Sequence, residues 1–252
     1  MIRVLSFAFR LRPLFVVAAL LGVAGCAKGP SGGAPPVNAL NRLTVSMTLQ
    51  QPVNNAYYYA FAFDDDDETN DGPRAIISST NFTNGIVGGS FGVLVLYNAG
   101  RFLVFRRTDQ GNGTERLEPA SRAFVIPPQT PVTGTTIRFT LDLDANIDTT
   151  GTPTAADRLF RAGAQRLNVN FVTTDRLQRD PNDLRQKAYD ALNEFEGAAD
   201  FSLTIPLNAT QTFTNAQTVR EPTNDAVIGV NPIDFNAAPL DITDFSIRVE
   251  RS

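Results

Sequence analysis

The sequence contains no histidine and no tryptophan, one cysteine among 252 residues, and two lysines, Lys28 and Lys187. Without histidine, the Ser-His-Asp and Cys-His constellations of nucleophilic enzymes are excluded. One cysteine and no histidine also exclude a zinc, haem or iron–sulfur site built by this chain alone. Nucleic-acid binding depends on clustered positive charge. The chain has a formal net charge of −4, so we expect no nucleic-acid partner.

The N-terminus has the pattern of a secretory signal. Arg3, Arg10 and Arg12 precede an uncharged apolar run over residues 14–25. At about 1.5 Å per residue, a helix over this run spans roughly 18 Å, which is too short for a hydrocarbon core of about 30 Å. We therefore predict that residues 1–25 form a cleaved signal peptide, not a membrane span.

The apolar run ends in Val23-Ala24-Gly25-Cys26, which resembles the lipobox of bacterial lipoproteins. The resemblance implies cleavage before Cys26, lipidation of its thiol with palmitate-like acyl chains, and a membrane anchor in the cell envelope. In Gram-negative lipoproteins an Asp after the cysteine favours the inner membrane, so Ala27 implies the outer membrane. The alternative is an ordinary secreted protein in which Cys26 is incidental.

Residues 26–41 combine this cysteine with a stretch rich in glycine and proline. Such a composition predicts a flexible tether with an r.m.s. span of roughly 20 Å. The alternative, an ordered first strand, is disfavoured by Pro30, Pro35 and Pro36.

From residue 42 to residue 252 the hydrophobic period is two. Leu43, Val45, Met47 and Leu49 alternate with polar residues, as expected for a half-buried strand. Further strands are expected at 57–63, 75–79, 91–97, 101–107, 122–126, 135–143, 167–173, 201–207 and 245–250. Many short strands separated by turn signals predict one all-β domain, mainly an antiparallel β-sandwich.

Two short helical excursions are expected within this domain. Residues 180–197 begin with a capping aspartate and a proline, and apolar residues then recur at helical spacing. A second helix is expected over 154–164. The polar stretch 208–239 is long for a structureless loop, so it contains short edge strands around 211–219 or is a functional loop.

Residues 57–64 (YYYAFAFD) and 169–176 (VNFVTTDR) resemble a group of uncharacterised bacterial secreted lipoproteins. That resemblance implies an exported β-sandwich but brings no activity with it. A more distant similarity is to sugar- or haem-binding sandwich domains, whose strands also end in acidic loops. This second similarity is an analogy of fold, which does not determine function.

The acidic segment DDDDETNDG, residues 64–72, is the most distinctive local feature. Adjacent carboxylates repel one another, and Ca²⁺ would relieve this repulsion through six to eight oxygen ligands. We predict a calcium site with Asp64, Asp65, Asp67 and Asp71 as ligands. The alternatives are a solvated acidic loop without an ion and, less favoured, a catalytic group of carboxylates.

Three other patterns resemble binding sites. Asp142, Asp144, Asn146 and Asp148 alternate as one solvent face of a strand would, or as a second calcium loop. Tyr58 alternates with core-facing tyrosines, so it is the exposed candidate for stacking on a sugar ring. The glycine-rich residues 85–92 lack the lysine of a phosphate loop, which indicates turns or bulges.

These features favour a lipid-anchored envelope protein whose non-catalytic sandwich binds a glycan or an envelope protein, or has a structural role. A calcium-stabilised module is compatible with that function. The alternative is a carboxylate-dependent, glycosidase-like hydrolase, which needs two acids roughly 5–10 Å apart and no histidine.

Overall fold

The computed structural model describes residues 41–68, 71–76, 84–109, 115–125, 128–177, 187–192, 202–218, 221–228 and 235–252. These residues belong to one compact unit, Ala39–Ser252. The predicted signal peptide, Cys26 and nearly all of the predicted tether lie outside the described residues. Within the described part of the chain, no helix is both long and apolar enough to cross a membrane.

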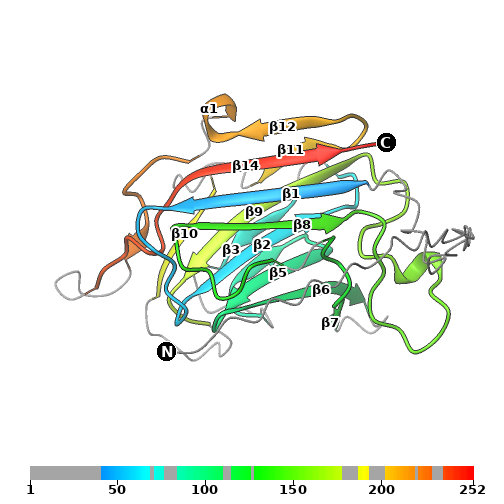
Figure 1. Cartoon of the computed structure of the whole chain (residues 1–252), viewed down its shortest axis with the longest axis horizontal. Helices are drawn as coiled ribbons and strands as arrows, with labels where there is room; N and C mark the ends of the chain where they lie inside the picture. Colours follow the sequence, from blue (N-terminus) through cyan, green and yellow to red (C-terminus); the bar gives the residue numbers. More distant parts are fainter. Residues whose placement is uncertain are drawn as a thin grey trace, which may run out of the picture. The chain divides into compact units, whose positions relative to one another are not determined.

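The described chain forms three antiparallel sheets (Figure 1). The four-stranded sheet has the order β12 (Gln211–Thr214), β14 (Ile242–Glu250), β1 (Arg42–Leu49) and β8 (Thr136–Asp142). The eight-stranded sheet has the order β13 (Val227–Ile228), β10 (Ala188–Ala191), β9 (Arg166–Thr174), β2 (Tyr58–Asp64), β5 (Val93–Asn98), β6 (Arg101–Asp109) and β7 (Glu115–Pro119), and β11 (Leu203–Pro206) also pairs with β9. Strands β3 (Pro73–Ala75) and β4 (Val87–Gly89) pair with each other.

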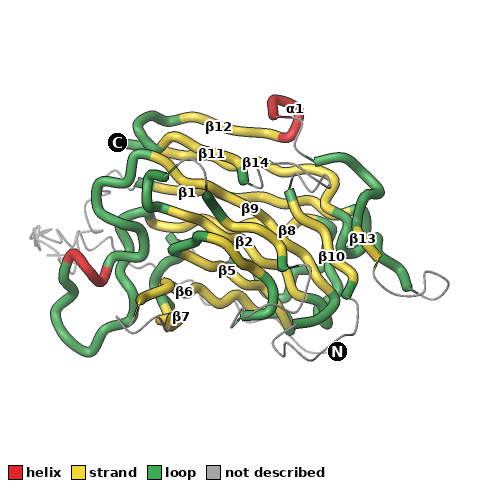
Figure 2. The backbone as a smooth tube through the Cα atoms, turned by 180° about the vertical axis from the view of Figure 1, so that it is seen from behind, coloured by secondary structure: helices red, strands yellow, loops and turns green. Residues whose placement is uncertain are grey.

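Helix is confined to two single turns in the described residues, the 3₁₀ turn η1 (Ala155–Asp157) and α1 (Asn215–Thr218), which directly follows β12 (Figure 2). The predicted all-β, antiparallel sandwich is therefore confirmed. Strand β12 also confirms that the long polar stretch contains an edge strand, because it pairs with β14 at the margin of the smaller sheet.

The two larger sheets pack face to face, because each contributes one apolar face to a common core. In β1, between β14 and β8, every second residue is buried, as the period-two pattern predicts. Aromatic rings join the layers. The ring of Phe61 in β2 lies 4.9 Å from that of Phe139 in β8, and Phe171 in β9 lies 6.0 Å from Phe245 in β14. Such edge-to-face pairs add to the stabilisation from apolar burial.

Strand β2 is buried on both faces. Tyr59, Phe61 and Phe63 belong to the inter-sheet core. Ala60 and Ala62 belong to a second apolar cluster on the opposite face, which also contains residues at and around β4. The small alanines leave room for this outer layer to lie close to the sheet, so the strand reads as almost continuously buried.

The helix predicted over 180–197 is wrong where it can be checked. Residues 187–192 contain strand β10, and the rest of the predicted helix lies outside the described residues. Tyr189 pairs with Thr174 of β9, and Ala188 pairs with Ile228 of β13. Sheet pairing on both sides therefore overrides a local helical pattern.

Two smaller expectations are also corrected. Over 154–164 only the single turn η1 forms, because the backbone bonds across to a neighbouring segment: Leu159 N donates to Ala145 O at 2.7 Å, and Ile147 N donates to Asp157 O at 2.7 Å. Within 122–125 the structure has only an isolated bridge at Phe124, not a strand.

The contacts between aromatic rings of the two larger sheets predict a specific effect on stability. Phe61→Ala should lower the free energy of unfolding by about 3–5 kcal/mol, because it leaves a cavity between the sheets. Urea denaturation of the chain in non-ionic detergent, followed by circular dichroism, measures the loss. The control is Leu103→Ala, in which the truncated side chain is 42% exposed and the expected change is below about 0.5 kcal/mol. Equal effects of the two substitutions would contradict the described core.

Candidate functional site

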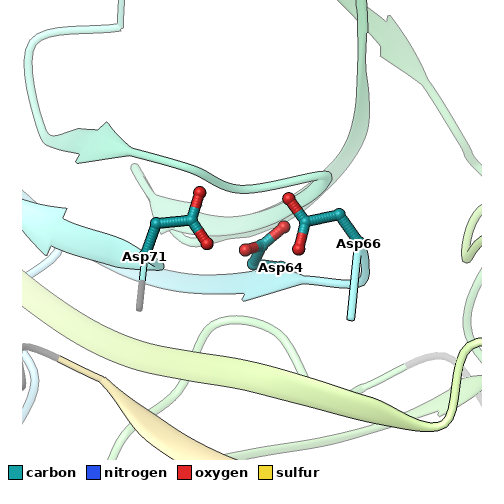
Figure 3. Close-up of side chains that lie close together, drawn as sticks. All are labelled: Asp64, Asp66 and Asp71. Carbon is teal, nitrogen blue, oxygen red and sulfur yellow. The ribbon is translucent and has the colours of Figure 1, made fainter. Parts of the chain in front are cut away.

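The acidic segment begins where β2 ends, and the structure separates its carboxylates into two groups. Asp65 and Asp67 are held by arginines and backbone N–H groups from other segments. Asp64, Asp66 and Asp71 instead turn toward one another (Figure 3). Residues 69 and 70 lie outside the described part of the segment.

Asp65 forms a buried ion pair. Arg106 Nη1 of β6 donates to both carboxylate oxygens, at 2.8 and 2.7 Å, and the Asp65 side chain is only 4% exposed. The backbone N–H of Arg161 donates to the same carboxylate. Gly92 packs directly on this pair, where a Cβ would collide with Asp65 Oδ1 and Arg106 Nη1. A glycine is therefore required for the close approach.

Asp67 fastens the segment to residues 161–166. Its backbone has the left-handed conformation, with φ of 68°. Arg161 Nη2 donates to Asp67 Oδ2 at 2.5 Å, and the backbone N–H groups of Gln165 and Arg166 donate to Oδ1 at 2.8 and 3.2 Å. These bonds occupy the Asp67 carboxylate with groups other than a metal ion.

Three of the other carboxylates, those of Asp64, Asp66 and Asp71, form a cluster, called the Asp64 cluster below. One oxygen from each of Asp64, Asp66 and Asp71 lies within 4.8 Å of the other two. Asp64 is 3% exposed, and its Oδ2 has no hydrogen-bond partner among the described residues. Asp66 accepts hydrogen bonds from Glu68 N at 2.8 Å and from Ser90 Oγ at 3.4 Å.

Burial, and after it repulsion from the neighbouring carboxylates Asp66 and Asp71, together raise the pKa of Asp64 to about 6. Arg107 of β6 interacts electrostatically with Asp64. Burial lowers the pKa of Arg107, and the attraction of Asp64 raises it. Arg107 Nη1 donates at 3.0 Å to the carbonyl of Gly89, and its guanidinium lies over the Phe91 ring.

Two buried asparagines of β9 hold the backbone around the cluster. Asn168 Nδ2 donates to the carbonyls of Glu68 at 2.7 Å and Asp71 at 2.9 Å, and Asn170 Nδ2 donates to the carbonyl of Pro73 at 3.1 Å. Sequence reasoning missed both asparagines. Their signal was present, because polar residues alternated with apolar ones in a strand whose other face is core.

The structure therefore revises the ligand set predicted from the sequence. Asp64 and Asp71 are in the cluster, whereas Asp65 and Asp67 are engaged by arginines. Asp66, which the sequence analysis left out, takes their place. The two groups could not be separated from the sequence, because side chains of consecutive residues leave the loop in different directions.

A second group of acids lies at the other end of β9. Oxygens of Asp190, Glu221 and Asp225 lie within 4.8 Å of one another. Asp190 accepts hydrogen bonds from Ile242 N at 2.7 Å and Ala191 N at 2.8 Å. Burial raises the pKa of Asp190 well above its usual value. This group could not be predicted from the sequence, since Asp190 lies in a different segment from Glu221 and Asp225.

The acidic series from Asp142 to Asp148 does not form one strand face, so that prediction is wrong. Strand β8 ends at Asp142, and the chain then turns. Asp144 pairs with Arg158 at 3.2 Å, while Asp148 accepts a hydrogen bond from Ser121 Oγ at 2.9 Å. The side chains point to separate partners, which does not favour a second calcium loop.

Tyr58 is partly buried against the outer apolar cluster of β2, so it is less available as a sugar platform than its predicted exposure suggested. A cavity of about 410 Å³ lies over the neighbouring part of the larger sheet. Its lining is mostly apolar, with Phe91 and Leu94 at the base and Arg107 and Arg116 among the polar groups. Tyr58 does not line it.

The positions of the acidic side chains can be compared with those in a glycosidase. Carboxylate pairs of glycosidases are roughly 5–10 Å apart across a cleft that holds the sugar. Among the cavities lined by described residues, one has a single acidic side chain in its lining, Asp144, and two others have none. The Asp64 cluster instead groups three carboxylates within the reach of one ion. That arrangement suits a hard cation, whose preferred ligands are carboxylate oxygens.

The buried ion pair of Asp65 and Arg106 predicts that removal of this arginine destabilises the fold far more than removal of an exposed one. Arg106→Ala should lower the free energy of unfolding by about 3 kcal/mol, because Asp65 would stay buried without its counter-charge. The control is Arg248→Ala, since the pair of Arg248 with Glu250 is exposed and should contribute less than about 1 kcal/mol. Urea titrations compare the two. A loss for Arg106→Ala as small as the control's would contradict this account.

The raised pKa of Asp64 predicts a pH dependence in metal-free buffer. An unfolded aspartate ionises near pH 4 and folded Asp64 near pH 6. The native state therefore binds the extra proton in this window, so wild-type stability should fall as the pH rises from about 4 to 6. Asp64→Asn removes this term.

The variant should match wild type near pH 4 and exceed it by up to about 3 kcal/mol at pH 7, at 1.36 kcal/mol per pKa unit. Thermal and urea unfolding at several pH values in a chelating buffer test this. Contributions from Asp190 and Asp225, whose pKa values are also raised, are common to both proteins and cancel in the difference. Parallel stability curves would show that Asp64 ionises normally in the fold.

The site can also be set against known proteins. Comparison with protein-family models, curated proteins and solved structures finds no match to this chain. The likeness to secreted bacterial lipoproteins therefore stays a prediction from sequence. What the chain does has to be argued from its own residues, namely the N-terminal motif, the sandwich and the Asp64 cluster.

Proposed function

We propose that this chain is a lipid-anchored protein of the bacterial cell envelope, held at the outer membrane, whose β-sandwich has a non-catalytic binding or structural role. One observation supports the proposed lipid anchor. The only cysteine of the chain, Cys26, stands directly after Val23-Ala24-Gly25 and closes a charge-free apolar run preceded by arginines. Lipid chains on that cysteine would provide the membrane attachment.

Two features of the described sandwich support a non-catalytic role over the glycosidase-like alternative. The described cavities lack the two facing carboxylates that glycoside hydrolysis requires. The buried acids Asp65 and Asp190 are engaged by an arginine and by backbone N–H groups, respectively, so they serve the architecture. The partner in this proposal is a glycan or another protein of the envelope.

Intact-mass analysis of the protein from its bacterial host tests the anchor. We expect residues 1–25 to be absent and acyl mass to be present on Cys26. Cys26→Ala should abolish the acyl mass and leave the signal peptide attached, because the cleavage that follows lipidation is blocked. A wild-type chain that keeps residues 1–25 and carries no acyl group would overturn the proposal.

A matched substitution tests the membrane assignment. Ala27→Asp should keep the lipid and the cleavage but move the protein from the outer-membrane to the inner-membrane fraction of a density gradient. Wild-type protein found in the inner-membrane fraction would refute the outer-membrane assignment while leaving the anchor intact.

A further inference from the structure

We propose that Asp64, Asp66 and Asp71 form a calcium-binding site at the end of strand β2. This inference goes beyond the proposed envelope function and does not depend on the lipid anchor. It assigns a ligand class to the Asp64 cluster, the three carboxylates of the acidic segment whose oxygens lie within reach of one ion.

The spacing of the three carboxylates fits a single Ca²⁺. Ligand oxygens lie about 2.3–2.6 Å from calcium, so oxygens on opposite sides of the ion are about 4.6–5.2 Å apart. The cluster places one oxygen of each carboxylate within 4.8 Å of the others. One ion could therefore contact all three side chains without a rearrangement of the loop.

An independent observation points to a ligand. Asp64 is 97% buried, and its Oδ2 has no hydrogen-bond partner among the described residues. Figure 3 shows Asp66 and Asp71 on either side of it, with all three carboxylates directed to a common point. A buried carboxylate oxygen without a partner is unfavourable, and like charges beside it make it more so. A cation at the common point would satisfy all three groups.

Two of the nearby arginines are bound to the other acids of the segment or to backbone. Arg106 is bound to the Asp65 carboxylate and to the carbonyl of Leu159 at 3.1 Å. Arg161 is bound to Asp67. Arg107, the cation that acts electrostatically on Asp64, donates to the backbone carbonyl of Gly89. The segment thus contains two acids that pair with arginines, Asp65 and Asp67, and the three acids of the Asp64 cluster.

The backbone on both sides of the cluster is fixed by the sheet. Asn168 of β9 holds the carbonyls of Glu68 and Asp71. Gly89 has φ of 74° and packs so tightly that a Cβ would collide with the carbonyl oxygen of Gly72. These contacts hold Asp71 and the Asp66 partner Ser90 beside the end of β2, so the ligands are preorganised before an ion binds.

Calcium fits this site better than magnesium. Magnesium requires near-ideal octahedral geometry at 2.0–2.1 Å, whereas calcium accepts six to eight oxygens in irregular arrangements. Asp64 is buried, Asp66 is half-buried and Asp71 is exposed, so water can complete the shell on the outer side only. A coordination shell with three carboxylates on one side and water on the other is typical of a moderate-affinity calcium site.

Equilibrium dialysis of the full chain with radioactive calcium tests the proposal. We expect one Ca²⁺ per chain with a Kd of about 0.1–1 mM, the range of extracellular calcium modules. Asp64→Asn and Asp71→Asn should each weaken binding at least tenfold. Asp71 is exposed, so its variant keeps the test valid even where Asp64→Asn impairs folding.

The matched control is Asp144→Asn, which removes an acid paired with Arg158 outside the cluster and should bind calcium as wild type does. Magnesium at tenfold excess should displace little of the calcium. Absence of saturable binding to the wild type, or undiminished binding by Asp71→Asn, would overturn the site. Equal losses in Asp144→Asn, or full displacement by magnesium, would also overturn it as a specific calcium site.

Discussion

Burial of strand β2 on both faces is the constraint from which the rest of the site follows. The large rings of Phe61 and Phe63 fill the inter-sheet core, and Ala60 and Ala62 admit a second layer against the opposite face. A strand enclosed in this way has no solvent face to which its polar end can turn. The first carboxylate after the aromatic run, Asp64, is therefore still buried, and its charge has to be dealt with inside the protein.

The fold deals with the acidic segment by dividing it. Asp65 pairs with Arg106 of β6, and Asp67 pairs with Arg161 of the loop before β9. These two carboxylates therefore connect segments that are distant in sequence. Breaking the buried pair of Asp65 and Arg106 is more costly than its formation is stabilising, since the remaining charge stays desolvated. The carboxylates of Asp64, Asp66 and Asp71 instead face one another, and this division separates the structural acids from the candidate ligands.

Period-two patterning predicted the strands well, because one face of β1, β8 or β14 is apolar and the other is polar. It failed at β10, where a helical spacing of alanines is overridden by pairing with β9 and β13. The cluster could be located to the acidic segment but not resolved into ligands. Asp65 is distinguished by its contacts with Arg106 and with the backbone of Arg161, which come from segments far along the chain and are not visible in the local sequence.

The proposed anchor and the proposed cation site rest on different residues but point to the same compartment. A calcium site with the affinity of extracellular modules stays unfilled where free calcium is far below that range. The signal-like N-terminus predicts export from the cytosol, and extracellular concentrations of calcium would fill such a site. The grouped carboxylates of Asp64, Asp66 and Asp71 would then meet their cation only after export, so the two proposals are consistent with each other.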